Sequence, residues 1–126
     1  MEGGALKKAY YVLLVDAVNT YLMEQGARLN EPDLVILFAD HTDRARELYN
    51  AHLGRLNLII VDAKTPGNPL TFVEDARKSG FTKEMMAVNE NDEQRLALMV
   101  AGCSAEIVDK NFVGEYILMR FLTSRF

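Results

Sequence analysis

The fold of this chain is constrained most by short, continuously apolar runs that alternate with segments of helical periodicity. The runs cover 11–15, 34–38, 58–61, 85–88 and 106–108. An unbroken apolar run is typical of a parallel strand that is covered on both faces. The segments with helical spacing cover 18–29, 42–53, 69–79, 92–101 and 112–122. The sequence therefore predicts five consecutive strand–helix units.

Repeated strand–helix units predict a single α/β domain with a doubly wound parallel sheet. Right-handed crossovers place helices on both faces of such a sheet, so we expect five strands flanked by five helices. A length of 126 residues, 49% of them hydrophobic and 25% charged, suits one domain with a full core. We assign this domain to 9–122, with an N-terminal extension at 1–8 and a C-terminal tail at 123–126.

The helix predicted at 42–53 has recognisable ends. Thr42 or Asp43 is expected to cap its N-terminus, because a short polar side chain can accept a hydrogen bond from the free N–H groups there. Gly54 is expected to end it.

The helix predicted at 92–101 shows the same signals. Asn91 or Asp92 is expected to cap it, and Gly102 to end it. Three apolar residues are spaced to share one face of the helix: Leu96, Met99 and Val100.

Composition excludes several classes of function. The net charge is −4 and no basic run exceeds Lys7–Lys8, so direct binding of nucleic acid is not expected. Cys103 is the single cysteine, and with His41 and His52 it forms neither a disulfide framework nor a zinc pattern. No apolar run approaches the ~20 residues that a membrane span needs. We expect a soluble, cytoplasmic protein that does not bind membranes.

Aspartates follow the first three predicted strands. Asp16, Asp40 and Asp62 each stand directly after or close behind an apolar run, at the edge of the sheet where ligands bind in open α/β folds. For Asp40, which precedes His41 and Thr42, turn formation is the simpler explanation. If the first and third strands are neighbours, Asp16 and Asp62 face each other. Two close carboxylates repel, which raises a pKa or favours a hard cation.

Three stretches of the sequence together resemble a known family. YVLLVDA at 11–17, NLIIVDAKTPGN at 57–68 and AGCSAEIVDKNF at 101–112 are similar to the signature regions of response regulator receiver domains of two-component signalling. The resemblance covers about 9–122 and implies a flavodoxin-like, CheY-like fold with strand order 2-1-3-4-5. It implies that Asp62 accepts a phosphoryl group from a histidine kinase or phosphotransfer protein in a phosphorelay. Pro66, four residues later, fits this pattern.

The resemblance also implies the other residues of the site. Attack of a carboxylate on a phosphoryl group brings two anions together, so positive charge must be supplied. Mg²⁺ would be held by Asp16, Asp62 and the backbone carbonyl of Lys64, and Lys110 would pair with the phosphoryl oxygens. Asn89 stands where the family has a Ser or Thr. The protein would not be an enzyme beyond phosphorylation and dephosphorylation of its own Asp62.

Four positions depart from the receiver pattern and leave two functions open. Ala17 replaces a second acid, so Mg²⁺ binding is expected to be weak or absent. Asn89, Ile107 and Asn111 replace the usual hydroxyl residue, aromatic residue and proline. The chain is therefore either an atypical phosphorylated receiver or a pseudo-receiver, a phosphorylation-independent interaction module.

A cofactor-binding flavodoxin-like protein is a third, less favoured alternative. Phosphate groups of a cofactor need a glycine- or hydroxyl-rich loop after a strand, and DAVNTY at 16–21 contains no glycine. The apolar segment FVGEYILMRFLTSRF at 112–126 predicts either an ordinary amphipathic last helix or a partner surface. In the second case, a homodimer would form through the fourth helix, the fifth strand and the fifth helix.

Overall fold

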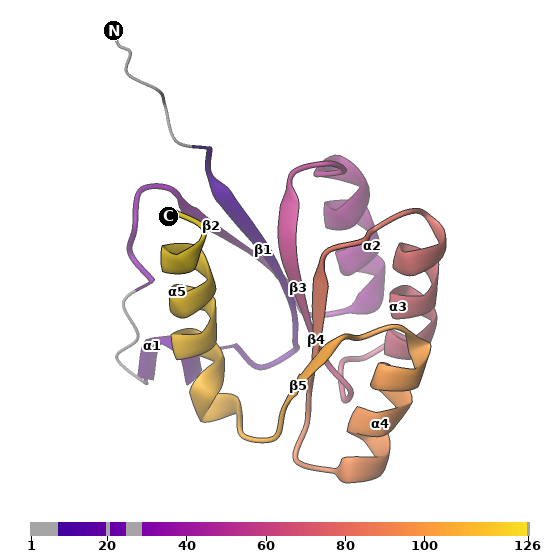
Figure 1. Ribbon diagram of the computed structural model, residues 1–126. Coiled ribbons are helices and arrows are strands. Elements are labelled where there is room, and N and C mark those ends of the chain that lie inside the picture. Colours follow the sequence, from indigo (N-terminus) through magenta and orange to yellow (C-terminus); the bar gives the residue numbers. More distant parts are fainter. Residues whose placement is uncertain (1–7, 20, 25–28, 126) are drawn as a thin grey trace, which may run out of the picture.

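Five parallel strands form one sheet in the order β2-β1-β3-β4-β5 (Figure 1). The structure is a computed structural model that describes residues 8–19, 21–24 and 29–125. The strands are β1 (Tyr10–Val15), β2 (Leu34–Ala39), β3 (Leu56–Asp62), β4 (Glu84–Val88) and β5 (Ala105–Ile107). The predicted sheet and its strand order are confirmed.

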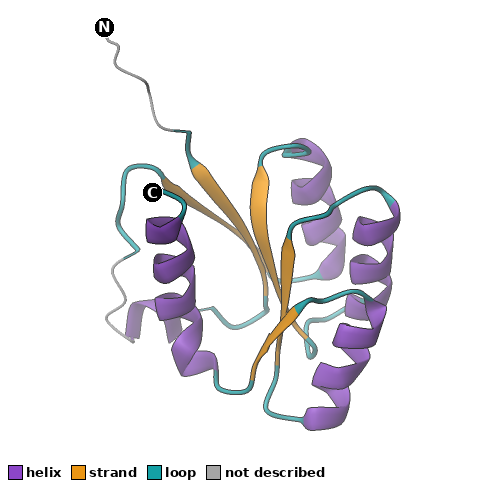
Figure 2. Cartoon of the chain, in the orientation of Figure 1, coloured by secondary structure: helices purple, strands orange, loops and turns teal. Residues whose placement is uncertain are grey.

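Helices cover both faces of this sheet (Figure 2). Four of them are two turns or longer: α2 (Thr42–Ala51), α3 (Pro69–Lys78), α4 (Asp92–Ala101) and α5 (Val113–Thr123). The helix predicted at 18–29 is seen only as the single turn α1 (Tyr21–Glu24), so four of the five expected helices are confirmed. Residues 20 and 25–28 of that segment, 1–7 of the predicted extension and 126 of the predicted tail lie outside the described residues.

The burial of the central strand β3 on both faces explains why its sequence is continuously apolar. Its residues 58–61 have no exposed surface. Ile59 and Val61 pack beneath α2, α3 and α4, whereas Leu58 and Ile60 pack on the opposite face beneath α1 and α5. Successive side chains of a strand point to opposite faces, so covering both faces requires every position to be apolar.

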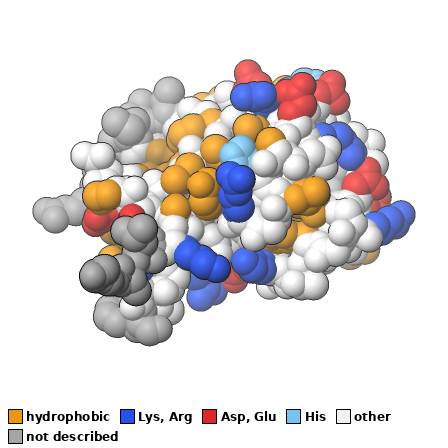
Figure 3. Space-filling model, turned by 90° about the horizontal axis from the view of Figure 1, so that it is seen from above, with side chains coloured by type: hydrophobic (Ala, Val, Ile, Leu, Met, Phe, Trp, Pro, Cys, Tyr) orange, Lys and Arg blue, Asp and Glu red, His pale blue; other side chains and the backbone are white. Residues whose placement is uncertain are grey.

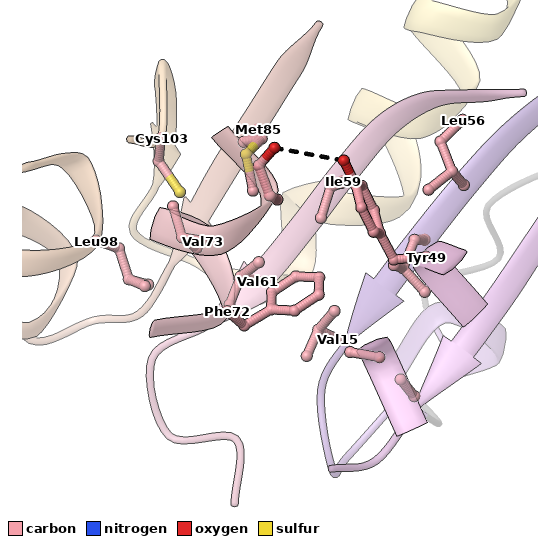
Figure 4. Packing of buried hydrophobic residues seen from close by; sticks show 14 of the residues in the cluster. Val15, Tyr49, Leu56, Ile59, Val61, Phe72, Val73, Met85, Leu98 and Cys103 are labelled. Carbon is pink, nitrogen blue, oxygen red and sulfur yellow. Dashed lines mark hydrogen bonds between the residues drawn. The ribbon is translucent and has the colours of Figure 1, made fainter. Parts of the chain in front are cut away.

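The core beneath α2, α3 and α4 is shown in Figure 4. The Tyr49 and Phe72 rings meet edge to face, with centroids 6.3 Å apart. The Tyr49 hydroxyl lies 3.3 Å from the Ala76 carbonyl oxygen, a contact marked by the dashed line. This bond satisfies the one polar atom that the ring brings into the core.

The predicted N-cap of α2 is wrong. His41 is the cap, and its Nδ1 accepts a hydrogen bond from the Asp43 N–H at 3.0 Å. Thr42 is buried and its hydroxyl oxygen instead accepts a bond from the Asn68 N–H at 3.0 Å, so it joins two loops. The helix ends at Ala51, before the turn that contains Gly54.

The ends of α4 agree with the sequence, but its buried face does not. Asn91 caps the helix and Gly102 ends it, as predicted. Leu96 and Val100 are 62% and 81% exposed, whereas Leu98 is fully buried. Leu98 enters the core and Met99, as predicted, packs against it, so the helix is rotated relative to the expected apolar face.

The N-terminal ends of the strands form the face seen in Figure 3, where apolar side chains gather among basic and acidic ones. A pocket of about 270 Å³ opens at this end, lined among others by Tyr49, His52, Leu56 and Phe81. The described residues that line it include no carboxylate. Among the described helices, none is long and apolar enough to cross a membrane.

Candidate functional site

Two buried carboxylates lie side by side at the C-terminal edge of the sheet. Asp16 follows β1 and Asp62 ends β3, and these strands are neighbours with Val15 paired to Val61. The side chains are almost completely enclosed, with Asp16 3% and Asp62 1% exposed. The predicted juxtaposition is confirmed. Asp40, by contrast, is exposed in the turn before α2.

Lys110 supplies the positive charge between the two carboxylates. Its Nζ lies 2.5 Å from Oδ2 of Asp62 and 3.1 Å from Oδ2 of Asp16. Lys110 begins the short 3₁₀ helix η1 (Lys110–Phe112), which Asp109 caps by accepting a bond from the Asn111 N–H. The cap fixes the backbone from which the half-buried Lys110 side chain reaches the site.

The two oxygens of Asp62 have different surroundings. Oδ1 accepts hydrogen bonds from the Lys64 N–H at 2.7 Å and from Nδ2 of Asn89 at 3.2 Å. Oδ2 is buried and, among the described residues, accepts no hydrogen bond of good geometry; its close neighbour is the Lys110 ammonium. The environment of Oδ2 is therefore set by the positive charge of Lys110, and that of Oδ1 by N–H donors.

Thr65 holds the end of β3 in place. Its hydroxyl oxygen lies 2.9 Å from the Val15 carbonyl and 2.7 Å from the Asp62 carbonyl. One buried hydroxyl thus joins the backbone of the strand that bears Asp62 to the strand that precedes Asp16. The sequence interpretation missed Thr65, although its position between Asp62 and Pro66 could have identified it.

Asp16 is enclosed by a different set of donors. Its Oδ1 accepts a bond from the Val18 N–H at 3.0 Å, and its Oδ2 from the Tyr21 hydroxyl at 3.1 Å. The Lys110 ammonium also lies over the Tyr21 ring, 5.5 Å from its centroid. Tyr21 was not predicted as a site residue, because only the turn after β1 brings it back to Asp16.

The electrostatics of the site follow from burial and close charges. Burial raises the pKa of Asp16, and repulsion from Asp62 adds to this, while the Val18 N–H and Lys110 oppose it. Burial lowers the pKa of Lys110, but its contacts with Asp62 and Asp16 together outweigh burial and raise it. Burial, followed by the charge of Asp16, raises the pKa of the Tyr21 phenol. Lys110 is therefore charged at neutral pH.

A pocket gives access to Asp62. Its volume is about 410 Å³, and it is lined by Asp62, Lys64, Asn89, Glu90, Val108, Asp109 and Lys110. Four of the five predicted site residues thus share one opening, and the fifth, Asp16, adjoins it through Lys110. The structure brings together every residue that the sequence predicted for the site.

The oxygen donors suit a weakly held Mg²⁺. Asp16 and Asp62 supply two carboxylates, and Mg²⁺ commonly uses one or two together with water and phosphate oxygens. Within the described part of the chain, no group of three or more His, Cys, Asp or Glu could hold a metal, and Ala17 adds no ligand. Lys110 interacts with the same carboxylates, so it would compete with a cation placed there.

Comparison with known proteins identifies the fold. No protein-family model and no curated protein matches the chain. Solved structures do match, among them receiver domains and a response regulator. The chain therefore has the fold of response regulator receiver domains.

Three of these structures show the extent of the similarity. The signal receiver domain of an HD domain-containing protein from Pseudomonas fluorescens Pf-5 has a TM-score of 0.72 at 15% identity, covering 98% of this chain and 92% of that one. CheY4 of Vibrio cholerae has a TM-score of 0.68 at 20% identity, covering 92% and 98%. The beryllofluoride-activated NtrC4 receiver domain dimer has a TM-score of 0.68 at 16% identity, covering 90% and 94%.

Proposed function

We propose that this chain is a receiver domain that accepts a phosphoryl group on Asp62 from a histidine kinase or phosphotransfer protein in a phosphorelay. The observation that carries the proposal is the environment of the Asp62 side chain. Its Oδ2 is paired with the Lys110 ammonium at 2.5 Å, and its side chain lines an open pocket of about 410 Å³. A partner histidine kinase implies a cytoplasmic setting.

The reaction is a transfer between two nucleophiles. A carboxylate oxygen of Asp62 forms a bond to phosphorus while the bond from phosphorus to the imidazole nitrogen of the donor breaks. The electron pair stays on that nitrogen, which takes up a proton from solvent. No catalytic group of this chain has to move a proton, so the site contributes position and positive charge.

Donors already directed at Asp62 can turn to the phosphoryl oxygens. The Lys64 N–H and Nδ2 of Asn89 both donate to Oδ1, and Lys110 faces Oδ2. An asparagine amide donates to an anion as a hydroxyl does, so Asn89 takes the place of the usual Ser or Thr. Lys110 offsets the added charge as a compact ammonium.

Mg²⁺ is the cofactor that we propose for this site. Asp16, Asp62 and the carbonyl of Lys64 would hold it, and it would supply charge that neutralises the phosphoryl oxygens. Its affinity is expected to be low because Ala17 supplies no carboxylate and Lys110 competes for the two that are present.

A pseudo-receiver is the second candidate function, and one observation favours it. All four oxygens of Asp16 and Asp62 already face donors or the Lys110 ammonium, which stabilises the site without phosphate or metal. Such a module would bind its partner through its surface whether or not Asp62 is phosphorylated. The two candidates differ in whether Asp62 forms an adduct.

We further propose that the surface of α4, β5 and α5 mediates homodimerisation. Large apolar side chains are exposed on or near these elements: Leu96, Val100, Val108, Phe112, Met119 and Leu122. Val108, Phe112 and Met119 line a shallow depression of about 650 Å³. The NtrC4 receiver domain, which has the same fold, is a dimer in its beryllofluoride-activated state, and this supports dimerisation as a proposal for this chain.

Beryllofluoride, a mimic of the phosphoryl group, tests the proposed function. We expect fluorine NMR signals of bound beryllofluoride at millimolar Mg²⁺, and their loss in Asp62→Asn. Asp40→Asn is the matched control, because it removes an exposed aspartate from a neighbouring strand end and should keep the signals. Absence of bound signals in the wild type would contradict phosphorylation and favour the pseudo-receiver.

A further inference from the structure

Arg95 is a buried arginine that the proposed reaction does not use. It lies in the first turn of α4 and is only 8% exposed. All three of its guanidinium nitrogens donate hydrogen bonds within the described part of the chain. A buried guanidinium that donates from all three nitrogens fixes the groups around it, because breaking one of these bonds leaves a buried polar group unpaired.

One of these bonds reaches the residue that contacts the phosphoacceptor. Nη1 of Arg95 donates to the backbone carbonyl of Asn89 at 2.8 Å. Asn89 is itself buried and donates from Nδ2 to Oδ1 of Asp62 at 3.2 Å. Arg95 is therefore two hydrogen bonds away from Asp62, without touching it.

The side chain of Asn89 has a fixed orientation. Its Oδ1 accepts a bond from the Asn91 N–H at 2.8 Å, so its Nδ2 must face Asp62. Its backbone N–H donates to the Ile107 carbonyl at 3.3 Å. With the Arg95 bond added, Asn89 is held through its N–H, its carbonyl and both amide atoms.

The other two bonds of Arg95 lead to the surface. Nε donates to Oε1 of Glu106 at 2.6 Å, and Nη2 donates to Oδ1 of Asp92 at 2.7 Å. Glu106 is exposed on β5, which forms one edge of the sheet. The same guanidinium thus contacts a residue of the phosphoacceptor site and a residue of the exposed edge.

Building on the proposed function, we propose that Arg95 is the positioning residue that holds Asn89 against Asp62 and couples this contact to the edge of β5 at Glu106. When a phosphoryl group draws the Asn89 amide toward itself, the Asn89 carbonyl moves with the backbone. Arg95 then has to readjust its bonds with Asp92 and Glu106. Ile107, at the position of the usual aromatic residue, has no polar group to do this.

A double-mutant cycle separates positioning from general stability. With acetyl phosphate as donor, Arg95→Gln is expected to slow phosphoryl incorporation at Asp62 about fivefold, which is typical of coupled neighbours. Asn89→Ala should slow it at least as much. If Arg95 acts through Asn89, the double variant should be no slower than Asn89→Ala alone. Independent, multiplying effects would overturn the proposal.

A matched arginine provides the control. Arg120 also pairs with a glutamate of the sheet, Glu84, at 2.9 Å, but this pair lies at the start of β4. Arg120→Gln should leave the rate unchanged. Glu106→Gln, which alters only the surface end of the Arg95 contacts, should slow incorporation about twofold in the same direction. A wild-type rate for Glu106→Gln would overturn the coupling to β5.

The resting protein gives a readout that does not depend on phosphorylation. Arg95→Gln should shift the NMR signals of the Asn89 side-chain amide, and Arg120→Gln should not. An unchanged Asn89 signal in Arg95→Gln would overturn the positioning role even if Asp62 is phosphorylated. A wild-type chain that forms no adduct, with the Asn89 shift present, would overturn the proposed function alone.

Discussion

At the scale of residues, the site consists of two acids in different environments that share one ammonium. Asp62 has one oxygen bonded to N–H donors and one facing Lys110. Asp16 instead accepts bonds from the Val18 N–H and the Tyr21 hydroxyl. This difference fits separate roles, with Asp62 as the proposed nucleophile and Asp16 as an anion that keeps Lys110 and a cation near it.

The raised pKa of Asp16 predicts that this residue costs stability in the resting protein. Asp16→Asn is expected to increase the free energy of unfolding by about 1 kcal/mol at pH 7, measured by urea denaturation. The reason is that burial and the charge of Asp62 raise the Asp16 pKa, so the folded state binds this proton more tightly than the unfolded state.

The sign of the pH dependence follows from the same shift. The stabilising influence of the protonated Asp16 is present below its ordinary pKa of about 4 and is lost as the pH rises through the higher folded value. The advantage of Asp16→Asn should therefore vanish below about pH 4 and grow toward neutrality. Asp40→Asn should show no such gain, and an Asp16→Asn variant less stable than wild type at pH 7 would contradict this account.

Residue types at strand ends predicted much of the site, but not all of it. Asp16, Asp62, Lys64, Asn89 and Lys110 could be found because strand ends in a parallel sheet meet at one edge. Tyr21 and Arg95 could not be found in this way. The contact of Tyr21 depends on the turn after β1, and the contacts of Arg95 depend on the rotation of α4. Apolar spacing predicts the buried face of a helix only approximately, because a polar contact with a neighbouring element can change the rotation of the helix.

At the scale of elements, two loops near the site are joined by backbone and hydroxyl contacts. The Thr42 N–H donates to the Pro66 carbonyl at 3.1 Å, and the Thr42 hydroxyl accepts from the Asn68 N–H. Because the Thr42 hydroxyl is bonded to the loop after β3, His41 caps α2 instead. A cap prediction from α2 alone could not include this competing partner.

Gly67 lies where these loops meet, and its close packing predicts that a substitution there is costly. Its φ is +99°, and an added Cβ would clash with the Thr42 hydroxyl and come within 2.9 Å of Cε1 of His41. Gly54, with φ of +83°, has open space around it. Gly54→Ala should cost about 1 kcal/mol, and Gly67→Ala about 1–3 kcal/mol more. Chemical denaturation checks this, and equal costs would contradict the packing.

At the scale of the whole molecule, the apolar pattern fixed the fold class. Five unbroken runs required a sheet covered on both faces, and the strands agree with these runs to within two residues at each end. Of the first predicted helix, at 18–29, the described residues show the single turn Tyr21–Glu24, and residues 20 and 25–28 lie outside the described part. Within this segment Leu22 is buried in the core, and Tyr21 and Leu29 pack against it.

The exposed apolar residues on α4, β5 and α5 predict self-association. Light scattering across a range of protein concentrations should detect dimers, and Met119→Glu should shift the chain toward the monomer because a charge would be buried without a partner. Leu53→Glu is the matched control, since Leu53 is similarly exposed but lies beyond α2. A chain that is monomeric at every concentration, with and without beryllofluoride, would contradict the proposed dimer.

The central claim is that Asp62 accepts a phosphoryl group, and intact-mass spectrometry after incubation with acetyl phosphate and Mg²⁺ tests it most directly. The wild type and Asp40→Asn should each gain the mass of one phosphoryl group, and peptide mapping should locate it on Asp62. Asp62→Asn should gain nothing. A wild-type mass that stays unchanged, or a phosphoryl group located on another residue, would contradict the account.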